Sequence, residues 1–397
     1  MVTEEKRRDP VIFNLKENKS SNKEDVKMKF KFMGIGAAGN KACMALIERG
    51  VVTTDDVVLV NSTKRDIPKD FKGKVIILSP DGNGCGKERQ SAREYAIMAM
   101  RNNAFDNLFD NETDNVLIVT SVEGGTGSGS TPIIGQYCSE VLAKNVHIVA
   151  FTGFEEDPRG MENTVEFFQE IDFTCSTQCI RNTAFLSEAE NNKFVAEQLA
   201  NDEFVSRVET LLGKGMVDSS QNIDDTDIFK VVATNGYKTV ERIEFDEILM
   251  DVNKFNKLCE QMIYSSKSLK TTAPGQIRMG VILNIKPESE NAIDFNFKVL
   301  KTAYGSPYES FFHKQYDGGK QYIRVICSGM KLPLDEVIAI HERCVKASEA
   351  VNTSEDDFFN KLAGLSAGNN SKFNMTRSSN APGSKENFLK KLETQPK

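Results

Sequence analysis

The chain has 397 residues, enough for about two or three domains with a buried core. Its 50 basic and 57 acidic side chains give a net charge of -7, which argues against direct nucleic-acid binding by the body of the protein. No apolar run approaches the ~20 residues of a membrane span, and residues 1–27 lack the apolar core of a secretory signal. We therefore expect a cytoplasmic protein with a polar N-terminal extension.

The first half of the chain alternates between short apolar runs and helical patterns. The runs lie near residues 28–33, 57–60, 75–78, 116–119, 146–151 and 183–186. This alternation predicts an α/β fold built on a parallel, doubly wound sheet. A longer helix is predicted from Asn201 to Leu212, where Phe204, Val208 and Leu211 lie on one stripe, and we expect it to join this sheet to the rest of the chain.

The pattern changes after about residue 229, where strand candidates predict a smaller mixed α+β domain. These candidates are Gln276–Ile285, Phe295–Thr302 and Gln321–Cys327, followed by a helix over Leu334–Val351. Asp317-Gly-Gly319 predicts a hairpin turn. The eight cysteines of a chain with a core of this size are expected to be reduced.

Gly124-Gly-Thr-Gly-Ser-Gly-Ser130 is the most informative segment, because it lies between the apolar run Val116–Val119 and a helix that begins at Thr131 and Pro132. Its glycines allow backbone N–H groups to converge on an anion, its hydroxyls add donors, and the next helix points its positive end at the same place. A flexible linker is the alternative, but linkers do not normally separate a strand from a proline-started helix. The loop lacks the lysine of a P-loop, so backbone dipoles and a metal ion must neutralise the phosphates that it holds.

Two more glycine loops follow strand candidates. Gly34-Ile-Gly36-Ala-Ala-Gly39-Asn40 fits the GxGxxG pattern of dinucleotide-binding proteins, but that class needs a carboxylate after the second strand, where this chain has Asn61. Asp81-Gly-Asn-Gly-Cys-Gly86 follows the third strand. Three such turns on successive strand ends suit a nucleoside triphosphate better than a dinucleotide, and a dinucleotide-dependent oxidoreductase is the alternative from another class.

These residues resemble the tubulin/FtsZ/TubZ family of GTPases, whose signature loop is GGGTG[ST]G, over roughly residues 28 to 351. Glu123 departs from the signature, since it stands where the family has its first glycine. Phe154-Glu155 with Arg159 resembles the ribose-contacting loop of the family, and Asn191-Asn-Lys193 resembles the segment that places an asparagine near guanine. The resemblance implies the tubulin/FtsZ fold, with GTP or GDP as ligand and Mg²⁺ as cofactor.

Ala200-Asn-Asp202 resembles the start of the family's central helix, whose aspartate reads the base. A carboxylate accepts hydrogen bonds from N1–H and the exocyclic amine of guanine but meets a lone pair on N1 of adenine. Asp202 would therefore select GTP over ATP. An aspartate favoured by the dipole at a helix N-terminus is the alternative.

The acidic stretch Asn222-Ile-Asp224-Asp-Thr-Asp227 reproduces the family's NxDxxD loop, through which one subunit completes the active site of its neighbour. In that role Asp224 and Asp227 would polarise the attacking water and help to hold Mg²⁺, while Asn222 would orient the loop. A solvated acidic turn that caps a helix is the alternative. A site shared in this way implies head-to-tail stacking into a filament that GTP hydrolysis weakens.

The candidate site residues fall into two groups, and the metal ligands are unknown. The proposed catalytic residues are Asn222, Asp224 and Asp227, and the proposed GTP-binding residues are Gly36, Ala37, Ala38, Gly39, Asn40, Gly84, Gly86, Gly124, Gly125, Thr126, Gly127, Ser128, Gly129, Glu155, Arg159, Asn191 and Asp202. The predicted organisation is an N-terminal extension (1–27), a GTP-binding domain (28–200), a central helix and catalytic loop (201–228), a C-terminal activation domain (229–351), and a C-terminal helix with a disordered basic tail (352–397).

The tail has two interpretations. It is either a solvated end or a recruitment tail in which residues 386–392 fold as a short amphipathic helix on a partner. Phe388-Leu-Lys390 matches only the second half of the terminal DIPxFLR peptide of cell-division FtsZ chains, whereas the basic tail resembles plasmid or phage segregation tubulins of the TubZ type. That resemblance implies a DNA-bound adaptor protein as a partner, with an FtsZ-type division filament as the alternative.

Overall fold

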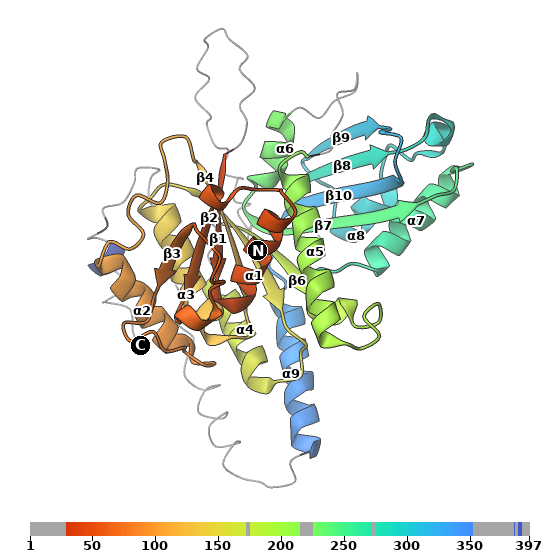
Figure 1. The fold of residues 1–397 in the computed structure, drawn as a ribbon. Helices are drawn as coiled ribbons and strands as arrows, with labels where there is room; N and C mark the ends of the chain where they lie inside the picture. The colour runs from red at the N-terminus through yellow and green to blue at the C-terminus, as the bar shows by residue number, and fades with distance from the viewer. Residues whose placement is uncertain are drawn as a thin grey trace, which may run out of the picture.

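The computed structural model describes residues 29–171, 175–214, 225–271, 275–351, 385 and 388–390. Within them a ten-stranded sheet crosses the molecule with helices on both faces, in the strand order β3-β2-β1-β4-β5-β6-β7-β10-β8-β9 (Figure 1). The strands are β1 (Phe30–Ile35), β2 (Val57–Asn61), β3 (Lys74–Ile77), β4 (Asn115–Ser121), β5 (Asn145–Thr152), β6 (Ser176–Arg181), β7 (Gly236–Phe245), β8 (Arg278–Asn284), β9 (Glu309–Gln315) and β10 (Gln321–Met330).

Strands β1 to β6 are parallel and confirm the predicted doubly wound α/β fold. Both faces of the sheet are covered, which is why its central strands are apolar throughout. Val57 and Leu59 belong to the core shared with one helical layer, and Val58 and Val60 belong to the core of the other. The first layer contains α1 (Gly36–Glu48) and α5 (Lys193–Leu211), and the second contains α2 (Arg89–Arg101), α3 (Gly125–Glu140), α4 (Pro158–Glu170) and α9 (Leu334–Val351).

The second half of the chain extends the same sheet. Strand β7 pairs with β6 only at Ser176↔Gly236 and Thr177↔Tyr237, and then runs antiparallel to β10. The smaller mixed sheet expected from the sequence is therefore continuous with the first one. Its helices are α6 (Asp225–Val232), α7 (Val252–Tyr264) and α8 (Lys298–Tyr304).

Several sequence predictions are wrong in detail. The run at 183–186 is not a strand, because β6 lies earlier and a 3-10 turn covers Asn182–Phe185. The segment Phe295–Thr302, predicted as a strand, contains none: Phe297 is left-handed with a φ of 50°, and helix α8 begins at Lys298. Asp317–Gly319 does not form a hairpin turn, because β8 lies between β9 and β10.

The central helix α5 begins at Lys193 rather than at 201, because the Asn192 side chain caps it there. Its buried Arg207 donates to the carbonyl of Cys179 on β6 and to the hydroxyl of Ser268, at 2.9 and 3.2 Å. These contacts fasten the helix both to the first half of the sheet and to the segment that follows α7.

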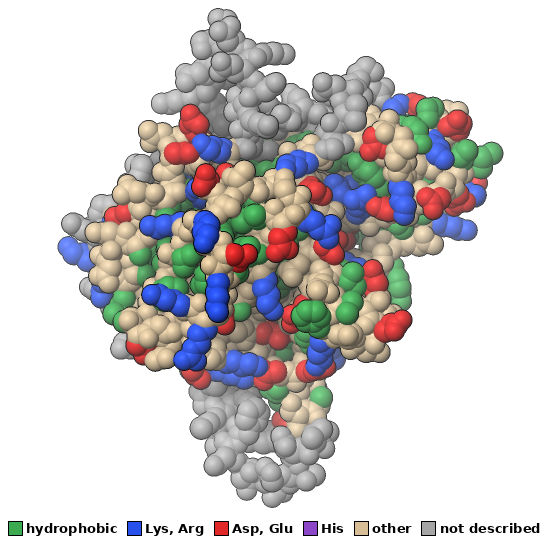
Figure 2. Space-filling model, in the orientation of Figure 1, with side chains coloured by type: hydrophobic (Ala, Val, Ile, Leu, Met, Phe, Trp, Pro, Cys, Tyr) green, Lys and Arg blue, Asp and Glu red, His purple; other side chains and the backbone are tan. Residues whose placement is uncertain are grey.

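Two further features concern the cysteines and the helices. All eight cysteines are unpaired thiols. Among the helices that the structure describes, none combines the length and the apolar character needed to cross a membrane. Figure 2 shows Lys and Arg side chains spread over the visible face with Asp and Glu among them.

His147 on β5 predicts a pH dependence of stability. Its ring is 3% exposed and lies 5.4 Å from the ring of Phe30, and neither ring nitrogen has a hydrogen-bond partner. Burial, with a smaller contribution from the charge of Lys238, lowers the pKa of His147 to about 3. The folded protein therefore excludes a proton that the unfolded chain binds below about pH 6.5, so this group reduces stability as the pH falls.

We expect His147→Leu to remove this group's contribution to the loss of stability at low pH. Between pH 7 and pH 5 the wild-type free energy of unfolding should fall by about 2 kcal/mol relative to the variant. Urea denaturation at each pH measures the difference. His147→Met is the control, because it should give the same pH slope even if its absolute stability differs, and parallel slopes for wild type and both variants would contradict the assignment.

Candidate nucleotide-binding site

The glycine loops meet where the strand order reverses. Strands β1 and β4 are parallel neighbours, with Ile35 beside Thr120 at their carboxyl ends, while β2 and β5 continue the sheet in opposite directions. Ligands of doubly wound sheets bind at such a switch point. Because α1 and α3 begin directly after β1 and β4, two helix N-termini face the same edge, which favours a bound anion.

Close backbone packing explains the glycines of the first two loops. A Cβ on Gly39 would lie 2.2 Å from the carbonyl oxygen of Val119, and a Cβ on Gly127 would lie 2.2 Å from Oγ1 of Thr120. Gly36 has a φ of +76°, and a Cβ there would lie 3.5 Å from the backbone nitrogen of Gly127. The predicted segments Gly36–Asn40 and Gly124–Gly129 are therefore in direct contact.

The third loop joins them. The backbone nitrogen of Gly125 donates to the carbonyl of Gly86 at 3.0 Å, and a Cβ on Gly129 would lie 2.2 Å from the carbonyl oxygen of Arg89. Gly84 and Gly124 have open space on their Cβ side, with nothing nearer than 4.0 Å. The structure thus brings all three predicted loops together at one edge of the sheet.

The hydroxyls of the main loop have hydrogen-bond partners within the protein. Ser128 donates to the carbonyl of Gly124, and Ser130 donates to the carbonyl of Thr126 at 2.6 Å, each four residues back along helix α3. Thr126 Oγ1 lies 2.7 Å from Oγ of Ser62, which follows β2. Since these hydroxyls already have partners, the donors left for a ligand are mainly backbone N–H groups.

Buried amide side chains also gather at the carboxyl ends of the strands. Asn40 is 1% exposed, and neither atom of its amide has a hydrogen-bond partner within the protein. Asn61 at the end of β2, Asn163 on α4 and Asn182 after β6 each bury one unpartnered amide atom. Because buried polar groups are normally hydrogen-bonded, this arrangement fits a polar ligand. Of these asparagines only Asn40 belongs to the predicted site, although the positions of Asn61 and Asn182 at the ends of strands are a signal in the sequence.

Glu155 and Arg159 lie next to the loops with partners of their own. Glu155 has a φ of 59°, and its carboxylate accepts hydrogen bonds from Nε of Arg181 and from the hydroxyl of Thr183, both at 3.0 Å. Arg159 pairs with Glu162 at 2.6 Å and with Glu88, beside the third loop, at 3.4 Å. The predicted ribose-contacting segment is therefore held between the end of β6 and the third glycine loop.

Glu123, which replaces the first glycine of the family signature, packs against Gly153 and Glu155. Its carboxylate occupies the space beside Gly153, where a Cβ would lie 2.0 Å from Oε2, and it accepts from the backbone nitrogen of Glu155 at 3.4 Å. Burial raises its pKa above the ordinary value. Glu123 thus connects the main glycine loop to the segment that carries Glu155.

The two predicted base-reading residues have different surroundings. Asn191 is exposed with a φ of 62°. The Asp202 carboxylate accepts from Arg49 at 2.5 Å, and Arg49 follows the C-terminal end of α1, roughly 20 Å along the helix from Gly36. The structure does not bring Asp202 to the phosphate-binding edge, and its role in guanine recognition stays a prediction.

Asp227, the described member of the proposed catalytic motif, lies toward the opposite end of the central helix. Asn222 and Asp224 fall outside the described residues. Asp227 lies on α6 and accepts from Lys230 at 3.0 Å. Helix α5 begins where Lys193 pairs with Glu156, just beyond the carboxyl end of β5, and runs about 28 Å toward α6 (Figure 1). One subunit therefore carries its glycine loops and Asp227 at different ends.

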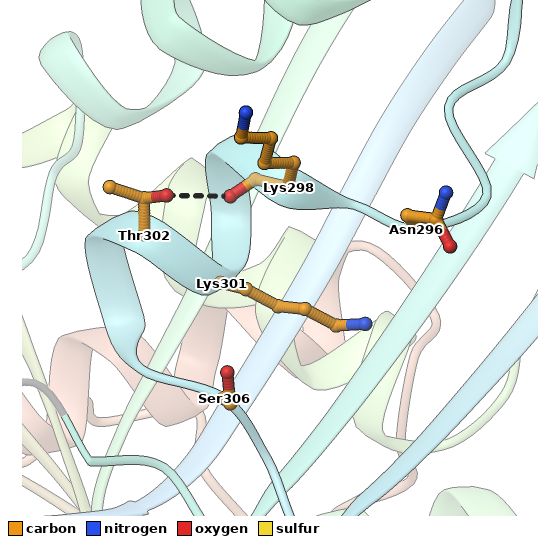
Figure 3. Close-up of a pocket in the computed structure, with 5 residues that line it drawn as sticks. All are labelled: Asn296, Lys298, Lys301, Thr302 and Ser306. Carbon is orange, nitrogen blue, oxygen red and sulfur yellow. Dashed lines mark hydrogen bonds between the residues drawn. The ribbon is translucent and has the colours of Figure 1, made fainter.

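A pocket of about 380 Å³ lies elsewhere, on the segment around α8. It is lined by Asn296, Lys298, Lys301, Thr302 and Ser306 (Figure 3). The ammonium groups of Lys298 and Lys301 point in different directions, and the Thr302 hydroxyl donates to the carbonyl of Lys298 at 2.9 Å (Figure 3). Since no group converges on a common point there, we assign the nucleotide to the glycine loops.

Known proteins resemble this chain in sequence. Residues 29–190 match the model of the Tubulin/FtsZ family, GTPase domain. The tubulin-like protein CetZ1 of Haloferax volcanii is 27% identical over 235 residues, which cover 54% of this chain and 58% of CetZ1. The tubulin-like protein TubZ of Clostridium botulinum C phage is 27% identical over 235 residues, which cover 56% of this chain and 61% of that TubZ. These alignments span about three fifths of the relatives' own length.

The fold comparison covers more of the chain. The GTPγS-form protofilament structure of Bacillus thuringiensis serovar israelensis TubZ has a TM-score of 0.66 at 15% identity, and the match covers 83% of this chain and 95% of that one. The protein therefore has the tubulin/FtsZ fold. The match to the Tubulin/FtsZ family, GTPase domain, covers residues 29–190, which contain all three glycine loops. The fold that the resemblance implies is confirmed. CetZ1 and the phage TubZ are both 27% identical to this chain over 235 residues, so these matches do not select the TubZ type.

Proposed function

We propose that this protein binds GTP with Mg²⁺, polymerises head to tail, and hydrolyses GTP at the interface between subunits. The observation that carries the proposal is the separation of the glycine loops from Asp227 by the length of α5. A nucleotide held at one end of a subunit can meet an acidic group from the other end only if a second subunit stacks on it. A contact of this kind does not close on itself, so it builds a filament.

The residues at the loops fit a nucleoside triphosphate. Backbone N–H groups of Gly36–Asn40 and Gly124–Gly129 supply the donors that phosphates need, and the unpartnered amide of Asn40 is buried beside them. Among the described residues, no three His, Cys, Asp or Glu side chains are grouped as metal ligands. Mg²⁺ is commonly held by substrate phosphates and only one or two carboxylates, so Asp224 and Asp227 of the adjoining subunit would be sufficient.

In this scheme each group has a specific task. Mg²⁺ offsets the charge of the phosphates when it is bound. The glycine loops hold the β- and γ-phosphates in line with a water molecule, while Asp224 and Asp227 of the neighbour orient that water and accept its proton. The bond between the γ-phosphorus and the bridging oxygen breaks as the water oxygen bonds to phosphorus. Asn222 orients the acidic loop, and loss of the γ-phosphate weakens the joint.

The cellular role that we propose is segregation of plasmid or phage DNA by a filament in the cytoplasm. It is supported by the basic tail and by the similarity to a phage TubZ. In this role the tail recruits a DNA-bound adaptor protein. A filament for cell division is the second candidate, because Phe388-Leu-Lys390 shares part of the FtsZ terminal peptide.

The test is to record light scattering and phosphate release together, with Mg²⁺ and GTP, GDP or ATP, over a range of protein concentrations. We expect both signals to rise with GTP alone above a shared critical concentration. Hydrolysis proportional to protein concentration without polymer would contradict the shared site. Binding of a nicotinamide dinucleotide without binding of GTP would instead favour the oxidoreductase alternative.

A further inference from the structure

The C-terminal segment of the chain is packed against its own GTPase domain. Phe388 is 4% exposed, and its ring meets Tyr137 of α3 edge to face at 5.6 Å and 65°. Leu389 packs against the same core, whereas Lys390 is exposed. An apolar pair from the end of the chain therefore lies on a surface formed near the C-terminal ends of α2 and α3.

A polar anchor accompanies the apolar contact. The Lys385 ammonium donates to Oδ1 of Asn103 at 2.7 Å and to Oδ1 of Asp106 at 2.9 Å. It also lies 6.0 Å from the centroid of the Tyr137 ring. Asp106 also accepts from the Tyr137 hydroxyl at 3.3 Å, so its carboxylate binds both Tyr137 and Lys385.

The receptor surface is built into the fold. Asn103 has a φ of 62°, and its backbone nitrogen donates to the carbonyl of Met100. This turn follows the end of α2 and directs the chain toward the core. Phe105 is then fully buried with its ring 6.2 Å from that of Tyr137. The surface offers an aromatic platform beside an acidic group, which complements the basic and aromatic character of Lys385 and Phe388.

We propose that this surface, defined by Asn103, Asp106 and Tyr137, is a receptor for the chain's own C-terminal segment and holds it in cis. The docked segment keeps Phe388 and Leu389 covered, so a partner that recognises them must first displace the segment. Docking in cis thereby inhibits binding of a partner to the tail. The docking itself is independent of GTP chemistry, and only its consequence for recruitment rests on the proposed role of the tail.

Zero-length cross-linking of the full chain tests the docking. A water-soluble carbodiimide joins the Lys385 amine to the Asp106 carboxylate as an amide, and the carbodiimide takes up the released water as a urea. In an equal mixture of ¹⁴N- and ¹⁵N-labelled chains, we expect peptides that join residues of the same isotope. Mixed-isotope pairs in the same yield would mean docking between chains and would overturn the proposal.

Variants in the tail test the contacts without disturbing the body. Phe388→Ala should lower the cross-link yield by about tenfold, because it removes most of the buried area of the segment. Lys390→Ala is the matched control, since its side chain is exposed, and its yield should equal that of the wild type. Equal yields for the two variants would overturn the assignment of Phe388 as the anchor.

A second measurement uses the absence of tryptophan from the chain. Phe388→Trp introduces a single reporter, whose emission should be blue-shifted and protected from acrylamide in the docked state. Adding Asp106→Ala should remove the lysine anchor and increase quenching severalfold. Quenching of the single variant as strong as that of free tryptophan would show that the segment is undocked and would contradict the proposal.

Discussion

Gly127→Ala is expected to weaken GTP binding by at least about 100-fold, because ångström-scale displacement of a positioning group has effects of this size. The new Cβ would lie 2.2 Å from Oγ1 of Thr120 and 2.4 Å from the carbonyl oxygen of Ser121, so the main loop must move. Thr120 donates to the carbonyl of Ile35 at 3.2 Å, so a displacement of Thr120 would also disturb the loop Gly34–Asn40. Titration with a fluorescent GTP analogue measures the loss.

Gly135→Ala is the matched control for this prediction. It makes the same substitution in the same helix, but its Cβ would meet only side-chain methyl groups at 3.7 Å or more. Alanine is favoured over glycine in helices by about 1 kcal/mol, so this variant should bind GTP normally and be at least as stable as the wild type. Equal affinities for the two variants would show that the loop is not the phosphate site.

Asp227→Ala is expected to lower GTP hydrolysis by about 100-fold or more while filaments still form. Removal of a group that positions or deprotonates the attacking water has effects of this size. The glycine loops lie at the other end of the subunit, so GTP binding should be unchanged. Phosphate release at saturating GTP, with sedimentation of the polymer in the same sample, separates catalysis from assembly.

Asp251→Ala provides the control, because it removes another carboxylate from the same half of the protein. Asp251 caps α7 by accepting from the backbone nitrogen of Lys254. Its loss should cost about 1 kcal/mol of stability and leave hydrolysis intact. Unchanged turnover in Asp227→Ala would refute its catalytic role, and loss of polymer in that variant would point to assembly.

The nucleotide-binding half could be predicted well because its signals are local. Glycines at 36, 39 and 127 recur where backbone segments must touch, and buried parallel strands such as β4 are apolar on both faces. Helix α9 begins and ends at the predicted residues. The asparagines after β2 and β6 were overlooked because their significance depends on strands that lie next to one another only in the folded sheet.

Two segments, β6 and the region before α8, were harder to predict because their residues do not follow a simple pattern. Strand β6 buries Ser176, Thr177 and Gln178, whose polar side chains conceal a central strand. The left-handed Phe297 converts an apolar run into a turn and a helix. Both features depend on packing partners far away in the sequence, which local propensity does not contain.

The linear order of residues was enough to predict a phosphate-binding loop, a doubly wound sheet and a resemblance to tubulin-like GTPases, because closely spaced glycines and apolar periodicity act over a few residues. Three further features required the folded chain: the distance between the glycine loops and Asp227, the pairing of Asp202 with Arg49, and the docking of Phe388 on Tyr137. Each feature concerns residues that are far apart in sequence. Whether such residues lie close together or far apart depends on the lengths and directions of the packed helices.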